Sequence, residues 1–380
     1  METLDRLGVL SSQMDLEPAE DAGCPKIPET RAKTPFISEA VLPGGKRIRL
    51  LKTLLTSACE RNCYYCPFRA GRDFRRATFK PDEMASTFMK LHRAGVAQGI
   101  FLSSGITGGG VRTQDKLIAT AEILRLKQNY QGYLHLKLMP GAERAQVERA
   151  MQLADRVSVN LEAPNTHRLK LLAPGKTFLD ELLEPLRWVE EIRRNHPPRL
   201  SWNGRWPSMT TQFVVGAVGE SDLEILKTTA YLHQQLRIRR AYFSAFRPIP
   251  DTPMENMPAE SPQREFRLYQ AAFLLRDYGF TLEDLSLETS GRLPLDIDPK
   301  IAWAKAHLAE QPVEINRASS QELLRIPGIG PKGADAILAA RKDNPLRIPE
   351  DLRKIGINPS RAMPYILLRG NRPIRQLALW

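Results

Sequence analysis

The strongest constraint on the fold is a regular alternation of strand-like and helix-like segments between residues 47 and 260. The strand-like runs are 49–56, 98–103, 133–139, 156–162, 209–216 and 240–246. The helical patterns are 81–94, 113–129, 143–153, 177–195 and 221–236, with a further helix, 262–278, after the last strand. Strands separated by helices form right-handed crossovers and a parallel sheet. Six such strands predict an α/β fold of the partial (β/α)6 barrel type, short of the eight strands of a closed barrel.

Two of these strands alternate strictly between apolar and polar residues. Leucines at 134, 136 and 138 alternate with Tyr133, His135 and Lys137, and the next strand places Ser158, Asn160 and Glu162 between apolar residues. A period of two puts each set on one face of the sheet. A structural barrel is filled by Val, Ile and Leu, so an inward polar face predicts a cavity for a polar ligand. The alternative is an edge strand with one solvated face.

The rest of the chain divides around this core. Residues 1–45 are rich in Pro and acidic groups after a short amphipathic stretch (Leu4, Leu7, Leu10), and we interpret them as a loosely structured N-terminal arm that contains Cys24. Residues 46–260 form the predicted partial barrel. Residues 261–312 are a helical extension and connector, and residues 313–380 are predicted to form a small all-α domain.

Three cysteines lie close together in the string Cys59-Glu-Arg-Asn-Cys63-Tyr-Tyr-Cys66, on a loop after the first predicted strand. Three thiolates can bind three irons of a cubane cluster and leave the fourth iron open, whereas most electron-transfer clusters use four cysteines. A zinc site needs four ligands, usually in two pairs. The sequence has no second pair, the nearest histidine, His92, lies on a predicted helix, and Cys24 lies on the arm.

The C-x3-C-x2-C spacing, with Tyr65 before the last cysteine, resembles the signature of the radical S-adenosylmethionine (SAM) superfamily, and the resemblance covers about residues 47–260. It implies a [4Fe–4S] cluster on Cys59, Cys63 and Cys66, with the open iron chelating the methionine part of SAM. One electron from the reduced cluster then cleaves SAM, and the resulting 5′-deoxyadenosyl radical abstracts hydrogen from the substrate. The protein supplies position and exclusion of water, and a flavodoxin or ferredoxin is the implied electron donor.

The resemblance also predicts the residues that bind SAM. The turn Ser103-Ser104-Gly105-Ile106 stands where the family has a Gly-Gly-Glu-like turn, but the acidic residue is missing here, so backbone and hydroxyl groups are the expected contacts. Asn160 and Glu162 stand where relatives bind the ribose. Gly216 belongs to residues 213–220, which resemble the family's fifth-strand motif beside the adenine. Residues 246–253 resemble the proline-rich segment that follows the sixth strand in the family. The residue that acts on the substrate is not identified by the sequence.

A second motif lies in residues 315–338. Ser319 and Glu322 form a capping box, Pro327 and Gly328 end that helix, and a second helix is expected to begin near Gly333. The glycines at 328, 330 and 333 are not a dinucleotide fingerprint, because that motif follows a strand. The string instead resembles a helix-hairpin-helix, which turns backbone N–H groups toward a phosphate. The implied nucleic-acid-binding residues are Gly328, Ile329, Gly330, Lys332 and Gly333, with a degenerate second copy at 352–357 and 361–368.

The charge of the chain supports an anionic partner. The net charge is +12, and residues 311–380 contain 12 Lys and Arg against 6 Asp and Glu. Such an excess favours nucleic acid, and we expect DNA rather than RNA or a protein-only contact. No apolar run is long enough for a membrane span, and no signal peptide is recognised, so the expected location is the cytoplasm.

For several other residues, a functional and a structural interpretation are both possible. The arginines at 69, 72, 75 and 76 would guide a phosphate backbone or form a solvated loop. His135 and Lys137 would contact substrate or serve the structure. Trp202 and Trp206 would stack on a base or pack internally.

The two motifs together resemble a family of DNA modification or repair radical SAM proteins, whose members are associated with a uracil-DNA-glycosylase-like protein. The leading interpretation is therefore an iron–sulfur enzyme that modifies or repairs a nucleotide in DNA. One alternative is a radical SAM enzyme that acts on RNA or a peptide. The other is a non-catalytic iron–sulfur protein that binds DNA or senses redox state.

Overall fold

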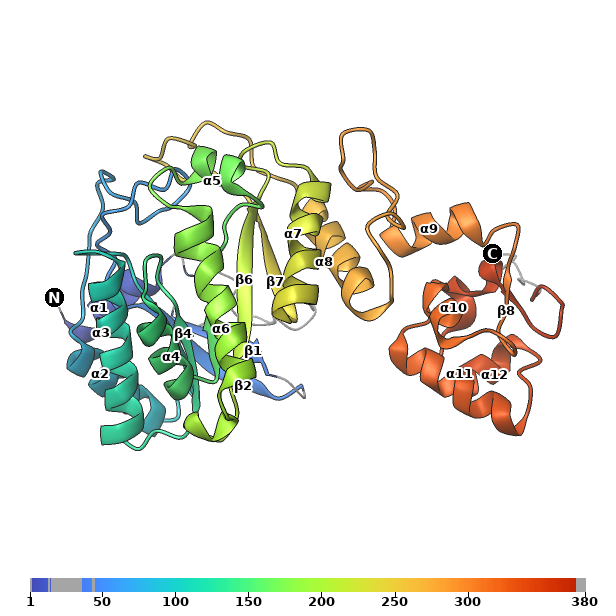
Figure 1. The fold of residues 1–380 in the computed structure, drawn as a ribbon, viewed down its shortest axis with the longest axis horizontal. Coiled ribbons are helices and arrows are strands. Elements are labelled where there is room, and N and C mark those ends of the chain that lie inside the picture. Colours follow the sequence, from blue (N-terminus) through green and yellow to red (C-terminus); the bar gives the residue numbers. More distant parts are fainter. Residues whose placement is uncertain (1, 13, 15–35, 43–44, 374–380) are drawn as a thin grey trace. The chain divides into compact units, whose positions relative to one another are not determined.

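The computed structural model describes residues 2–12, 14, 36–42 and 45–373. The chain divides into two compact units, and we describe each by itself. The barrel unit contains residues 1–220 and 231–260, and the C-terminal unit contains residues 221–230 and 261–380 (Figure 1). Within the described residues, no helix is both long enough and apolar enough to cross a bilayer.

The barrel unit is built on a seven-stranded sheet in which the strands follow one another in chain order. The first pair, β1 (Ile37–Val41) and β2 (Arg47–Leu54), is antiparallel. All later pairs are parallel: β3 (Gly99–Ser103), β4 (Tyr133–Lys137), β5 (Arg156–Ser158), β6 (Ser208–Val215) and β7 (Arg240–Ala245). The prediction of a partial α/β barrel with six parallel strands is confirmed.

Helices connect the parallel strands. They are α2 (Pro81–Arg93), α3 (Gly110–Glu122) with its π-helical end η2 (Ile123–Lys127), α4 (Arg144–Leu153), α5 (Thr166–Leu172), η3 (Phe178–Leu183), α6 (Glu184–Asn195), η4 (Pro198–Leu200) and α7 (Asp222–Leu236). The five predicted connecting helices are present. The short helix α5 was not predicted, although Asn165 caps it by accepting the backbone N–H of Arg168 at 2.9 Å.

The prediction of a loosely structured arm is wrong for two segments of residues 1–45. Thr3–Ser11 forms α1, which contacts β2 and buries Leu7 and Leu10 completely, while Leu4 stays exposed. The second segment, Ile37–Val41, pairs with β2 as an additional edge strand. Burial of apolar side chains stabilises a short amphipathic helix that would not form alone. Cys24 lies outside the described residues.

The C-terminal unit has its own core. Its elements are α8 (Pro262–Asp277), α9 (Pro299–His307), β8 (Val313–Glu314), α10 (Ser320–Arg325), α11 (Pro331–Asp343), α12 (Pro349–Lys354), η5 (Pro359–Arg361), η6 (Met363–Tyr365) and β9 (Ile366–Leu367). Leu323, Ile326, Ile337, Leu352 and Ile366 are fully buried in it. The domain is helical as predicted, apart from the short parallel pair β8–β9.

The predicted second copy of the hairpin motif is only half formed. Its first helix corresponds to α12, but residues 361–368 form 3₁₀ turns and strand β9 in place of a second α-helix. Pro364 lies in the middle of this segment, and proline removes a helix hydrogen bond and clashes with the preceding turn.

A buried ion pair anchors α8 inside the C-terminal unit. Arg264 Nε donates to Asp222 Oδ1 at 2.8 Å, and both side chains are almost completely inaccessible. The second carboxylate oxygen of Asp222 accepts the backbone N–H of Leu293, also at 2.8 Å. The carboxylate therefore joins α8 to the segment that follows it.

We predict that Asp222→Ala destabilises the C-terminal unit by about 3–5 kcal/mol, because it leaves the Arg264 charge buried without its carboxylate. The matched control is Asp277→Ala, which removes an exposed carboxylate paired with Arg276 and should cost about 0–1 kcal/mol. Amide hydrogen exchange of α8 and α11 in the full chain measures both. Equal loss of protection in the two variants would contradict the role given to Asp222.

Candidate active site

The loop that carries the cysteines is held against the turn after β3 by backbone contacts. Gly105 N–H donates to the carbonyl of Thr56 at 2.7 Å, and Glu60 N–H donates to the carbonyl of Ile106 at 2.8 Å. A side chain at Gly105 would overlap the carbonyl oxygen of Ala58. The absence of a side chain at this position is what allows the two segments to approach each other.

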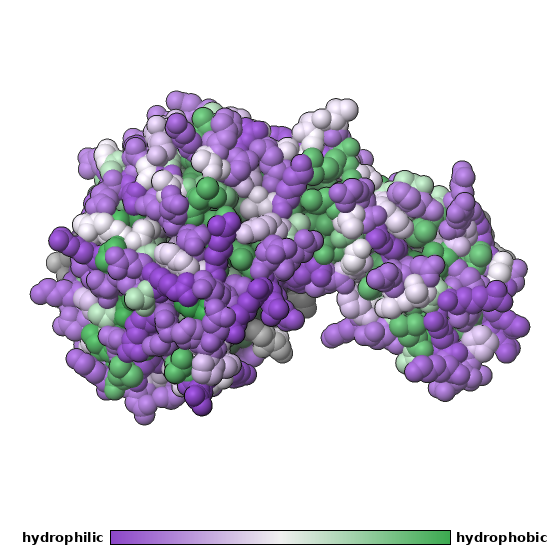
Figure 2. Space-filling view, in the orientation of Figure 1, coloured by the Kyte–Doolittle hydropathy of each residue, from purple (hydrophilic) through white to green (hydrophobic). Residues whose placement is uncertain are grey.

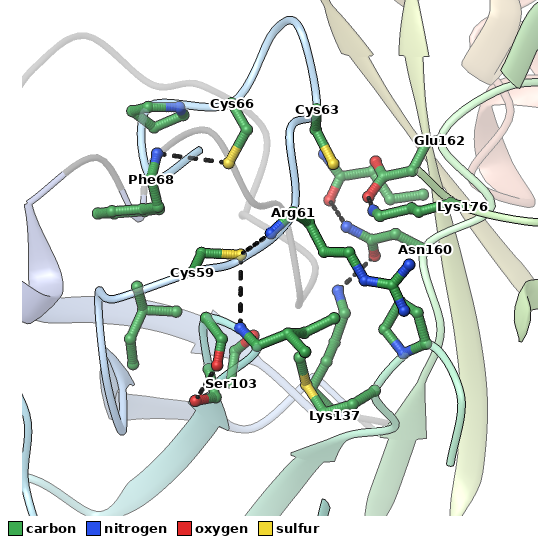
Figure 3. Close-up of a pocket in the computed structure, with 18 of the residues that line it drawn as sticks. Cys59, Arg61, Cys63, Cys66, Phe68, Ser103, Lys137, Asn160, Glu162 and Lys176 are labelled. Carbon is green, nitrogen blue, oxygen red and sulfur yellow. Dashed lines mark hydrogen bonds and ion pairs between the residues drawn. The ribbon is translucent and has the colours of Figure 1, made fainter. Parts of the chain in front are cut away.

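The three cysteines lie around one cavity at the carboxyl ends of the strands (Figure 3). Cys59 Sγ accepts the backbone N–H groups of Arg61 and Ile106, each at 3.4 Å. Cys66 Sγ accepts the N–H of Phe68 at 3.4 Å. Cys63 is buried, and all three are free thiols. Backbone N–H groups directed at sulfur stabilise the negative charge that a thiolate ligand carries.

The burial of these thiols favours binding of a metal cluster. Burial raises the pKa of Cys63 and of Cys66 above the ordinary value, so both groups stay protonated until a cation replaces the proton. In the described part of the chain, no three His, Cys, Asp or Glu side chains form a site for a single metal ion. The donor set of three thiols around a cavity fits three irons of a [4Fe–4S] cluster.

The sequence placed five further residues in this cavity, and they line it together with the cysteines: Ser103, Ser104, Gly105, Asn160 and Glu162. The sixth, Gly216, is not among the lining residues. Its backbone has a φ of +93°, and its N–H donates to the carboxylate of Glu220. An added Cβ there would collide with Glu260. The packing of the loop after β6 explains this glycine without a ligand.

A ladder of polar side chains crosses the inner face of the sheet, as the strand pattern predicted. Lys137 Nζ donates to Asn160 Oδ1, and Asn160 Nδ2 donates to Gln212 Oε1 at 3.4 Å. All three line the cavity. Lys137 and Gln212 are buried and Asn160 is half-buried. The amide groups can both donate and accept hydrogen bonds, which suits a ligand with hydroxyl or base nitrogen groups.

Glu162 and Lys176 form a buried ion pair beside Cys63. Lys176 Nζ lies 3.0 Å from Glu162 Oε1, and the other carboxylate oxygen is buried with no hydrogen-bond partner among the described residues. Glu162 has a φ of +66°, which is rare for a residue with a side chain and often marks a functional position. Burial opposes the charge of Lys176, but the carboxylate of Glu162 and Cys63 in its thiolate form outweigh it and hold the lysine pKa above its ordinary value.

Sequence reasoning missed Lys176 and Glu60. Lys176 lies in a loop after α5 and belongs to no periodic pattern. Glu60 lies inside the cysteine motif, and its carboxylate accepts the N–H groups of Gly108 and Gly109 at 2.9 and 3.1 Å. The turn after β3 has no acidic residue of its own, and Glu60 reaches it from the neighbouring loop. Arg61 is held by an ion pair in which its Nη2 lies 2.6 Å from Glu181 Oε1.

The remaining sequence candidates in the barrel mostly serve the structure. His135 Nε2 lies 2.8 Å from Ser158 Oγ, and its ring packs on Phe101. Arg76 donates to four backbone carbonyls of the cysteine loop, and Arg72 donates to two carbonyls. The guanidinium of Arg125 lies 3.6 Å from the ring centre of Trp202. Lys137 is the exception, because it lines the cavity.

The hairpin in the C-terminal unit has the expected local geometry. The Ser319–Glu322 capping box opens α10, Gly328 has a φ of +84°, and Gly330 is the N-cap of α11. The second helix begins at Pro331, slightly earlier than predicted. Lys332 is exposed in its first turn, which contains no acidic residue, and Gly333 follows. Ile329 is buried and fixes the turn, and Lys300 Nζ donates to its carbonyl at 2.6 Å.

Lys300 lies between this hairpin and α8. Its ammonium group lies 4.5 Å from the ring centre of Tyr278, and burial lowers its pKa to about 7. It braces the turn from the side of the core, so the exposed N–H groups at the start of α11 keep a fixed position. This residue, too, was not identified from the sequence.

Comparison with known protein families agrees with both motifs. Residues 53–231 match the model of the radical SAM superfamily, and residues 309–361 match that of the helix-hairpin-helix motif. A search of curated proteins finds no match.

Three solved structures illustrate what the chain is similar to. Methylornithine synthase is 14% identical over 67% of each chain, with a TM-score of 0.47. The FeFe-hydrogenase maturase from Carboxydothermus hydrogenoformans is 15% identical over 60% of this chain and 51% of its own, with a TM-score of 0.46. A radical SAM methyltransferase from Sphaerobacter thermophilus is 16% identical over 61% of this chain and 68% of its own, with a TM-score of 0.44. The chain spans about half the length of the hydrogenase maturases that it matches.

The matched models, the three thiols and the polar cavity all agree on the chemistry of the barrel unit. The chain therefore contains a radical SAM domain followed by a helix-hairpin-helix motif.

Proposed function

We propose that the chain is a radical SAM enzyme that uses a [4Fe–4S] cluster and SAM to modify or repair a nucleotide in DNA. The helix-hairpin-helix would dock it on the sugar-phosphate backbone. The observation that carries the proposal is the exposed start of α11: a glycine turn, an N-cap glycine and Lys332, with no acidic side chain in the first turn. Such a helix terminus favours a phosphate through its free N–H groups and its dipole. Contacts of this type hold a protein on nucleic acid without reading its sequence.

The site residues have distinct roles in this proposal. Cys59, Cys63 and Cys66 would hold the cluster, which when bound supplies the electron that cleaves SAM. Ser103, Ser104 and Gly105 would contact the methionine part of SAM through backbone and hydroxyl groups. Asn160 and Glu162 would bind the ribose hydroxyls, since Glu162 has a buried oxygen without a partner among the described residues. Glu60 positions the turn beside them.

The proposal has further parts that come from the family resemblance. A flavodoxin or ferredoxin would supply the electron, and a uracil-DNA-glycosylase-like protein would be a partner. The reaction would take place in the cytoplasm, where thiols stay reduced. A base within a duplex must leave the stack before its atoms can be reached, so the target would be a flipped or unpaired nucleotide.

The principal alternative is a radical SAM enzyme that acts on RNA or a peptide and uses the hairpin only for docking. The net charge of +12 and the basic C-terminal segment favour a polyanion over a peptide. Digestion of treated DNA, RNA and peptide, followed by mass spectrometry of the products, separates these substrates. A mass change confined to RNA or peptide would overturn the DNA proposal.

We predict that Lys332→Glu weakens duplex DNA binding at least tenfold, because it places a negative charge where a phosphate would lie. The slope of log K against log salt concentration should become shallower by the amount expected for about one phosphate contact. SAM cleavage without DNA should not change. The matched control is Lys342→Glu, at the other end of α11, which makes the same change of charge. Anisotropy of a labelled duplex measures both, and equal weakening would contradict docking through the hairpin.

We also predict that Lys176 raises the reduction potential of the bound cluster, because a buried cation beside Cys63 stabilises the extra negative charge of the reduced state. Lys176→Met should lower the potential by about 60 mV, which corresponds to a tenfold change in a one-electron equilibrium. Lys176→Arg keeps the charge and should stay near the wild type. A redox titration followed by EPR measures the three proteins. The same potential in the Met and Arg variants would contradict the electrostatic role.

A further inference from the structure

The connection between α6 and β6 builds a basic cavity at the end of the barrel unit opposite the cysteines. Figure 1 shows this connection at the lower end of α6, whereas α5 lies at the upper end. It comprises residues 196–207, which is longer than the roughly two to six residues usual for a helix-to-strand connection in α/β folds. Long ordered connections of this kind often have a function of their own.

The connection is held in place by hydrogen bonds. Trp206 Nε1 donates to the carbonyl of His196 at 3.1 Å, and Trp202 N–H donates to the carbonyl of Gln152 at 2.8 Å. Asn203 Nδ2 donates to Asp155 Oδ1 at 3.2 Å, and Gly204, with a φ of +72°, makes the turn between them. The Trp206 ring is therefore fixed by its nitrogen, and it remains half-buried at the wall of the cavity.

The charge around this cavity is strongly positive. Its lining includes Arg193, Arg205, Arg237, Arg239 and Trp206, and no described lining residue is acidic. The cavity is open to the surface, with a volume of about 510 Å³. Arg205, Arg237 and Arg239 are exposed, so their guanidinium groups are accessible to a ligand.

The carboxylates near this cavity, in the described part of the chain, are shared among several cations. Glu190, which is buried beneath the cavity, pairs with Arg194 at 2.9 Å, with Arg237 at 3.4 Å and with Arg193 at 3.7 Å. One carboxylate thus serves three guanidinium groups. Asp155 is paired with the buried Arg125 at 2.9 Å. Glu148 faces His196 at 3.6 Å. Among the described residues, guanidinium groups therefore outnumber carboxylates around the cavity.

Helix stabilisation explains only part of this arrangement. Arginines at the end of α6 interact favourably with the helix dipole, which accounts for Arg193 and Arg194. It does not account for Arg205, which belongs to the connection. Arg237 has a φ of +51°, a backbone conformation that costs roughly 1 kcal/mol or more outside glycine. The chain accepts this strain and places a guanidinium at the rim.

We propose that this cavity binds a single-stranded segment of nucleic acid. Guanidinium groups form paired hydrogen bonds with phosphodiester oxygens. An indole ring gives an unpaired base a stacking surface, worth about 1–3 kcal/mol per base. A base within a duplex has no free face, so the indole favours the single strand. Free nucleotides carry the same two groups, and the test below distinguishes the two sources.

The site is separate from the cluster cavity. Ser208 begins β6 at the basic cavity, and Gln212 further along the same strand lines the cluster cavity. With a rise of about 3.3 Å per residue, the stretch of β6 from Ser208 to Gln212 spans roughly 13 Å. A strand bound here is therefore not the segment that reacts but one that flanks it. The inference does not depend on the hairpin of the C-terminal unit, and its test can fail or succeed independently.

The test uses the full chain carrying Lys332→Glu, so that any contribution of the hairpin is reduced, and measures anisotropy of a labelled oligothymidylate. Arg205→Glu with Arg239→Glu should weaken binding at least tenfold and should lower the salt dependence by one to two phosphate contacts. Trp206→Leu should weaken binding by roughly tenfold while the salt dependence stays the same. The matched control is Lys90→Glu with Lys116→Glu, which makes the same change of charge on exposed positions of α2 and α3.

Two results would overturn the proposal. The first is equal weakening in the arginine and lysine pairs, which would show a general effect of net charge. The second is displacement of the labelled oligonucleotide by ATP when both are present at the same concentration of nucleotide units. That result would assign the cavity to free nucleotides. Circular dichroism checks that each variant is folded, and the conservative pair Arg205→Lys with Arg239→Lys should retain most of the binding.

Discussion

The site depends on the close approach of two backbones, the cysteine loop and the turn after β3. The contact exists because Gly105 has no side chain to collide with Ala58. It brings the N–H of Ile106 onto Cys59 Sγ and the N–H groups of Gly108 and Gly109 onto Glu60. One small residue thus aligns a cluster ligand, the turn expected to contact SAM and the start of α3. A larger residue there would separate all three.

Buried charge is the second constraint, and part of it lies around the cysteine cavity. The inner face of the sheet carries Lys137, Asn160 and Gln212, and the cavity wall adds the Glu162–Lys176 pair. Buried charges cost free energy unless they are paired, and breaking such a pair is more costly still. Their presence around the cysteines is consistent with a site that binds a polar cofactor and adjusts the charge beside the cluster. The apolar faces of the same strands pack on the helices and supply the stability.

The sequence allowed the fold to be predicted where periodicity is strong. Six parallel strands and their five connecting helices follow from alternating residues and helical patterns, and the capping box of Ser319 and Glu322 is present as predicted. β1, α1 and α5 were missed because short elements gain their stability from tertiary packing rather than from local preference. Lys176 and Glu60 were missed for a related reason. Both lie in irregular segments, and only the folded chain brings them to the cavity and the turn.

We propose that the radical SAM domain and the helix-hairpin-helix motif serve one reaction on DNA. The most direct measurement reconstitutes the cluster without oxygen, adds dithionite and SAM, and quantifies 5′-deoxyadenosine with and without DNA, both duplex and single-stranded. We expect DNA to stimulate SAM cleavage severalfold, and RNA of the same sequence to do so less. Cleavage at the same rate with and without DNA would contradict the claim, because the cofactor chemistry would then be indifferent to the proposed substrate.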